Sequence, residues 1–106
     1  LTAVSGSGPA YVFYFIEALQ QAARELGLDA AQARQLSLET FLGAARLASQ
    51  SEEDAATLRA RVTSKGGTTE RALQSMEHDG VRSAIARAIH AAHERARELG
   101  DEFGKE

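Results

Sequence analysis

Residues 10–16 read Ala-Tyr-Val-Phe-Tyr-Phe-Ile, an apolar and aromatic run that contains no charge. Pro9 precedes the run and suits the first turn of a helix, with Ser7 or Gly8 as the N-cap. Gly27 suits the end of that helix. A helix on the surface of a monomer keeps one polar face, but the first half of this helix is apolar on every side. The run therefore predicts a long helix that is buried on both sides.

The rest of the sequence also predicts helices, because no segment shows sustained apolar alternation of period two. Asp29 begins a capping box for a second long helix. Ser51 is expected to cap a shorter helix, whose first turn holds the acidic residues 52–54. A brief helix should end near Gly80, and residues 81–103 carry apolar side chains at helical spacing. The fold class is therefore all-α.

The length, charge and cysteine content limit the number of domains and the kinds of partner that the chain can have. A chain of 106 residues can bury one core, so residues 1–106 are expected to form one domain that a partner chain would stabilise. The formal charge of -3 is spread over mixed acids and bases, which excludes a basic stripe for nucleic acid or for a membrane surface. No cysteine is present, which excludes disulfides and thiolate metal sites and fits a cytoplasmic protein. The start at Leu1, with no signal-peptide pattern, indicates a boundary inside a larger protein.

Residues 62–69 read Val-Thr-Ser-Lys-Gly-Gly-Thr-Thr and form the segment with the clearest chemistry. Gly66 and Gly67 allow positive φ and a close approach of a ligand to the backbone. Thr68 or Thr69 can cap the helix that follows. Unpaired N–H groups at that helix start, together with the helix dipole, would attract a carboxylate. An ordinary turn between two helices is the alternative for the same residues.

This segment resembles the signature of pyrroline-5-carboxylate reductase. That pattern has an aliphatic residue, two small hydroxyl-type residues, a variable position, Gly-Gly, another variable position and Thr, followed by a helix with Ala-Leu and a later apolar residue. The matching positions are Val62, Thr63, Ser64, Lys65, Gly66, Gly67, Thr68, Thr69, Ala72, Leu73 and Met76. A second block, Ser-Gly-Ser-Gly-Pro-Ala-Tyr at residues 5–11, resembles the start of that family's C-terminal domain. The resemblance covers essentially the whole chain but only part of the enzyme.

The resemblance implies a fold, an assembly and a cofactor. The fold is an all-α domain with long intertwined helices, similar to the 6-phosphogluconate dehydrogenase C-terminal-like class, and residues 10–16 would pair between subunits of a homodimer or larger homo-oligomer. A monomer core is the alternative for that apolar run. NADPH or NADH would be bound mainly by an N-terminal domain outside this chain, because residues 6–8 lack the strand and the remaining positions of a dinucleotide fingerprint. No cofactor-binding residue is therefore expected here, and the chain alone should be inactive.

The resemblance also implies a reaction and its residues. The reaction is the reduction of 1-pyrroline-5-carboxylate to L-proline, and the pocket places the imine carbon near the nicotinamide. The residues expected to bind the substrate are Ser64, Gly66, Gly67, Thr68 and Thr69. The Ser64 side chain and the N–H groups of Gly67 and Thr68 would hold the carboxylate. The Thr69 hydroxyl would reach the ring nitrogen, which makes Thr69 the catalytic candidate, as an orienting donor rather than as a strong acid.

Other polar groups carry weaker signals. His90, His93 and Glu94 share one helix, but the order His-x-x-His-Glu offers no third ligand at motif spacing, so no metal site is expected. Two alternatives to the reductase stay open. One is a non-catalytic helical dimerisation module in which residues 66–67 form only a turn. The other is the helical domain of another NAD(P)-dependent dehydrogenase, such as the hydroxyisobutyrate type, although residues 69–73 lack that group's catalytic lysine and asparagine.

Overall fold

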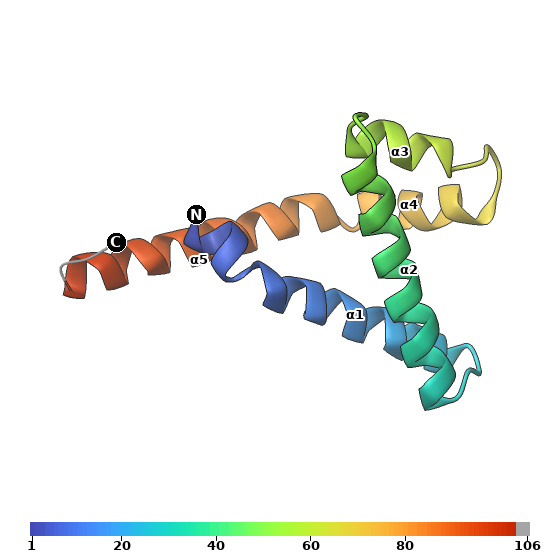
Figure 1. Ribbon diagram of the computed structural model, residues 1–106, viewed down its shortest axis with the longest axis horizontal. Helices are drawn as coiled ribbons and strands as arrows, with labels where there is room; N and C mark the ends of the chain where they lie inside the picture. Colours follow the sequence, from blue (N-terminus) through green and yellow to red (C-terminus); the bar gives the residue numbers. More distant parts are fainter. Residues whose placement is uncertain (104–106) are drawn as a thin grey trace. The chain divides into compact units, whose positions relative to one another are not determined.

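The computed structural model describes residues 1–103, with side chains described as far as residue 100. The elements, in order, are the π-helical turn η1 (Thr2–Gly6) and the α-helices α1 (Gly8–Glu25), α2 (Ala30–Gln50), α3 (Ala55–Arg61), α4 (Thr68–His78) and α5 (Val81–Phe103) (Figure 1). No strand occurs among the described residues, so the prediction of an all-α fold is confirmed. The chain divides into two units, Ala10–Thr63 and Leu1–Pro9 with the segment from Ser64 onward.

Helix α1 of the first unit ends where the sequence predicted. Gly27 has a φ of 109°, a left-handed value that glycine adopts without strain. The N–H of Gly27 donates to the Arg24 carbonyl at 3.0 Å, and the N–H of Leu28 donates to the Ala23 carbonyl at 3.2 Å. These two hydrogen bonds form a Schellman motif, which satisfies carbonyls that the helix end would otherwise leave without donors. The chain then turns into α2 (Figure 1).

Helix α2 begins with the predicted capping box. The Gln32 N–H donates to Asp29 Oδ1 at 2.8 Å, and the Asp29 N–H donates to Gln32 Oε1 at 3.1 Å. One face of the helix then carries Ala33 and Ser37, which are buried, and Phe41 one turn further on. The Phe41 ring meets Phe15 of α1 edge to face, with ring centroids 5.6 Å apart. The edge-to-face pair of Phe15 and Phe41 therefore links α2 to α1.

Helix α3 begins three residues later than predicted. The expected cap, Ser51, is instead the C-cap of α2, and its Oγ accepts the Glu53 N–H at 3.1 Å. The N-cap of α3 is Asp54, whose Oδ1 accepts the Thr57 N–H at 2.9 Å. An aspartate gains from the helix dipole as well as from the hydrogen bond, whereas a serine gains only from the hydrogen bond. The acidic residues 52–54 therefore precede the helix instead of forming its first turn.

The second unit is built around α5. The turn η1 packs against α5 and contains Ala3, which is buried. This turn, closed by the Ser7 N–H donating to the Thr2 carbonyl at 2.8 Å, was not predicted. Helix α4 also packs against α5. It ends before Gly80, as predicted, and Gly80 has a φ of 68°.

The aromatic run of α1 is exposed in the single chain. Phe13 and Tyr14 expose 64% and 77% of their surface, and Val12 and Phe15 expose smaller fractions. The run was predicted to be buried on both sides. The described residues of a single chain do not bury it. Among the described helices, none is both long enough and apolar enough to span a bilayer.

Candidate functional site

The five candidate site residues lie in the loop between α3 and α4 and in the first turn of α4. Ser64, Gly66 and Gly67 belong to the loop, and Thr68 and Thr69 are the first two residues of the helix. Gly67 is half-buried, whereas the other four are exposed to solvent. The structure therefore brings the predicted residues together at one helix start that solvent can reach.

The loop makes a β-turn of a defined type. The Gly67 N–H donates to the Ser64 carbonyl at 3.1 Å, which closes a four-residue turn. Gly66 has a φ of 77°, and Lys65 does not have positive φ. Positive φ at the third position alone is the geometry of a type II turn, which favours glycine there. The prediction of positive φ is therefore confirmed for Gly66.

Gly67 is needed for a different reason. Its φ is −93°, so the prediction of positive φ is wrong at this position. A Cβ on Gly67 would lie 3.3 Å from the Ser64 carbonyl oxygen, which is closer than ordinary van der Waals contact. The lack of a Cβ at Gly67 thus allows this residue to lie close to the Ser64 carbonyl within the turn.

Helix α4 starts without the predicted threonine cap. Gly67 is the N-cap, Thr68 is the first helical residue, and among the described residues no side chain caps this end. The Gly67 N–H is already used to close the turn, so the chain leaves the turn extended at Gly67 and becomes helical one residue later. A threonine inside the first turn does not have the N-cap position from which its oxygen would reach the orphan N–H groups. The prediction of a Thr68 or Thr69 cap is therefore wrong.

The N–H groups of residues 66–69, which span the turn and the start of α4, divide into two sets. Those of Gly66 and Gly67 donate within the chain, to Glu70 and Ser64 respectively. Those of Thr68 and Thr69 head the helix, where neither a side-chain cap nor a turn carbonyl accepts them within residues 1–103. The N–H groups of Thr68 and Thr69 are therefore the ones open to an anion. The Gly67 N–H, which was expected to bind the carboxylate, already donates to the Ser64 carbonyl.

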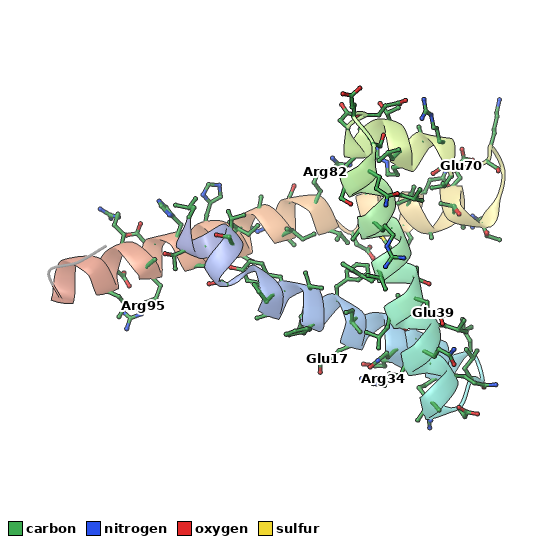
Figure 2. All side chains as sticks on the ribbon, in the orientation of Figure 1. Glu17, Arg34, Glu39, Glu70, Arg82 and Arg95 are labelled. Carbon is green, nitrogen blue, oxygen red and sulfur yellow. The ribbon has the colours of Figure 1, made fainter. Side chains whose placement is uncertain are left out.

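Glu70 is a residue of this corner that the sequence reasoning missed. Its Oε1 accepts the Gly66 N–H at 3.0 Å, and Figure 2 labels it at the beginning of α4. Glu70 is the third residue of the helix, the position from which a capping-box glutamate reaches back to the N-cap N–H. Here the N-cap N–H closes the turn, so Glu70 takes the preceding N–H instead. A glutamate three residues after the N-cap is the sequence signal that indicates this contact.

Two ion pairs lie on the surface of α5 in the second half of the helix. The Arg97 Nη2 donates to Glu94 Oε1 at 2.6 Å, and the Arg95 Nη1 donates to Glu98 Oε1 at 3.3 Å. The hydrogen bond from Arg97 lowers the pKa of Glu94. Within residues 1–103, no three His, Asp or Glu side chains gather in a way that would hold a metal ion.

Three comparisons with known proteins bear on this chain. Residues 1–99 match the family described as pyrroline-5-carboxylate reductase dimerisation. The pyrroline-5-carboxylate reductase of Pseudomonas aeruginosa is 46% identical over 105 residues, which cover 99% of this chain and 38% of that protein. The pyrroline-5-carboxylate reductase 3 of Xenopus laevis is 48% identical over 99 residues, which cover 93% of this chain and 36% of that protein.

Solved structures give the same result. A pyrroline-5-carboxylate reductase from Coxiella burnetii superposes with a TM-score of 0.89 at 49% identity, over 92% of this chain and 36% of that one. The pyrroline carboxylate reductase of Plasmodium falciparum, solved with NADP bound, superposes with a TM-score of 0.90 at 34% identity, over 93% of this chain and 38% of that one. The chain thus spans 36% to 38% of the length of these relatives. The chain belongs to the pyrroline-5-carboxylate reductase dimerisation family.

Proposed function

We propose that the complete gene product that carries this chain reduces 1-pyrroline-5-carboxylate to L-proline with NAD(P)H, the last step of proline biosynthesis. The observation that carries the proposal is the family match over residues 1–99, joined to relatives that are pyrroline-5-carboxylate reductases. The described residues contain no strand and so provide no dinucleotide-binding unit. The nicotinamide supplies the hydride when it is bound, and this chain supplies the place for the substrate.

The substrate carboxylate is assigned to the start of α4. The proposed donors are the N–H groups of Thr68 and Thr69, which no side chain caps among the described residues, and the Ser64 side chain, which is exposed. The helix dipole adds a partial positive charge of about half a unit at this end, which favours a bound anion. Gly66 and Gly67 shape the loop, and their N–H groups already have acceptors in the chain.

The Thr69 side chain is assigned to the imine. Thr69 is exposed at the second position of α4, next to the proposed carboxylate site, which supports the assignment of its hydroxyl as the donor to the ring nitrogen. A threonine hydroxyl is a weak acid, and its role is therefore to orient the ring and not to supply the proton by itself. Holding the imine in one orientation lowers the entropic part of the barrier.

The exposed aromatic run of α1 is assigned to a second copy of the chain. Phe13 and Tyr14 expose most of their surface in the single chain. Burying apolar surface gains about 25 cal/mol per Å². The description of the matching family names dimerisation of pyrroline-5-carboxylate reductase. We therefore infer a homodimer or larger homo-oligomer in which this run lies between subunits.

The charge and the cysteine content support two further inferences. A formal charge of -3 without a basic stripe favours neither nucleic acid nor a membrane surface as a partner. The lack of cysteine is compatible with a reducing cytoplasm, which is where we place the protein. Fractionation of cells that express the complete gene product tests the location.

The experiment that tests the function uses the complete gene product with 1-pyrroline-5-carboxylate and either NADPH or NADH. Wild-type protein should form L-proline. Thr69→Ala should lower kcat by about tenfold to a hundredfold, because it removes a hydrogen bond made to the reacting ring. Thr69→Ser retains the hydroxyl and should keep most of the activity.

Two outcomes would contradict the proposal. A wild-type protein that forms no L-proline with either cofactor would support a non-catalytic module or another dehydrogenase. A Thr69→Ala variant with unchanged kcat and KM would remove Thr69 from the mechanism. Gln74→Ala, a substitution of an exposed residue further along α4, is the control for general effects on the helix.

A further inference from the structure

The Glu70 carboxylate fixes a peptide group that the proposed substrate contacts do not use. Its Oε1 accepts the Gly66 N–H at 3.0 Å, while the Gly67 N–H closes the same turn on the Ser64 carbonyl at 3.1 Å. Glu70 is half-buried, although Ser64 and Gly66 are exposed. Both N–H groups of the Gly-Gly pair are therefore held by the chain itself.

The peptide that Glu70 contacts is the one that distinguishes two kinds of turn. Type I and type II turns differ by a reversal of the peptide between the two central residues, which here joins Lys65 to Gly66. The φ of 77° at Gly66 assigns this turn to type II. In a type I turn, the Lys65 carbonyl would take the side on which the Gly66 N–H now lies. Two acceptors, that carbonyl and the Glu70 carboxylate, would then face each other, so Glu70 favours type II and opposes type I.

We propose that Glu70 is a positioning residue of the carboxylate site, which keeps the turn before α4 in its type II form without touching the substrate. This inference rests on the proposed function. A ligand that binds one form of the loop has an apparent affinity reduced by the fraction of molecules in the other form. Glu70 raises the fraction in the observed form, so the loop is already arranged when the substrate arrives.

The hydrogen bond and the charge of Glu70 act in opposite directions. The hydrogen bond arranges the loop and should strengthen binding of the substrate. The negative charge lies beside N–H groups assigned to an anion and should weaken binding. Glu70→Gln removes the charge and keeps an oxygen that accepts the Gly66 N–H, whereas Glu70→Ala removes both. The two variants therefore separate the two effects.

The experiment compares kcat and KM for 1-pyrroline-5-carboxylate in the complete gene product. Glu70→Ala should raise KM by about twofold to fivefold with kcat nearly unchanged, because the bond is worth about 1 kcal/mol and acts on loop population. Glu70→Gln should have the KM of the wild type or a lower one. Glu77→Ala should change neither constant, because Glu77 lies on the same helix and pairs with Arg82 at 2.8 Å, away from the loop.

A double substitution tests whether Glu70 acts through the turn. Gly66→Ala disfavours the type II form through its positive φ, so it biases the same equilibrium as Glu70→Ala. The double variant should therefore raise KM by more than the product of the two single effects. Independent effects that simply multiply would overturn the proposal.

Amide hydrogen exchange gives a readout that does not depend on the reaction. Exchange at the Gly66 N–H should quicken by about fivefold in Glu70→Ala and stay near the wild-type rate in Glu70→Gln. An unchanged exchange rate in Glu70→Ala, or equal KM shifts in the Ala and Gln variants, would overturn the proposal. A wild-type protein without reductase activity would contradict the proposed function instead, and the exchange measurement would still decide the role of Glu70 in the turn.

Discussion

Replacing Gly66 by alanine tests the backbone geometry that shapes the loop before α4. The φ of Gly66 is 77°, a left-handed value that costs a residue with a Cβ about 1–2 kcal/mol. Alanine also restricts the unfolded chain, which offsets about 0.4–1 kcal/mol of that cost. Apart from Gly66 and its two chain neighbours, no described atom lies within 4 Å of a Cβ built on Gly66, so no steric clash with the rest of the chain adds to the conformational strain. We expect Gly66→Ala to lower the free energy of unfolding by about 1 kcal/mol.

Gly43→Ala provides the matched control. Gly43 lies inside α2 without positive φ, and a Cβ built on it meets no atom within 4 Å beyond its chain neighbours and the nearby backbone of its own helix. Alanine inside a helix is more stable than glycine by about 0.5–1 kcal/mol, so this variant should gain stability. Urea unfolding of the complete gene product, followed by circular dichroism at one protein concentration, measures both changes. Equal effects of the two substitutions, or a stabilising Gly66→Ala, would refute the reasoning from φ.

Three further predictions concern the first unit. The hydrogen bond from the Thr57 N–H lowers the pKa of Asp54 from 3.8, so the stabilisation is present above pH 3.8 and is lost as the pH falls through the lower folded-state pKa. The stability difference between wild type and Asp54→Ala should therefore shrink in acid, and unfolding at a series of pH values measures it. A double-mutant cycle on Phe15 and Phe41 should give a coupling of about 0.5–1.5 kcal/mol, and a coupling near zero would contradict the edge-to-face contact. Tyr14→Lys should shift the protein towards monomer in sedimentation, because it places a charge in the proposed interface, and an unchanged sedimentation coefficient would argue against that interface.

Local signals in the sequence were sufficient for most helix boundaries. The capping box of Asp29 and the helix stops at Gly27 and Gly80 lie where they were predicted. Each of these signals acts through hydrogen bonds or φ angles within a few residues, so the surrounding structure has little influence on it. The positive φ of Gly66 belongs to the same group.

Competition between neighbouring groups was not predicted correctly. Ser51 and Asp54 both suit an N-cap, and the charged side chain takes the position. At the candidate site, the Gly67 N–H closes the turn, which moves the helix start to Thr68 and directs Glu70 to Gly66. Each N–H donates to one principal acceptor, so a correct prediction requires knowledge of all the acceptors that compete for it.

The sequence by itself determined that the chain is helical, where most of its helices end and which loop carries the candidate site. Those features depend on apolar spacing, caps and glycines that act within one or two turns of a helix. The tertiary structure alone decided that η1 forms and packs against α5, burying Ala3. This contact joins the two ends of the sequence, and its stability comes from surface that is buried only after the chain has folded, so no local pattern encodes it.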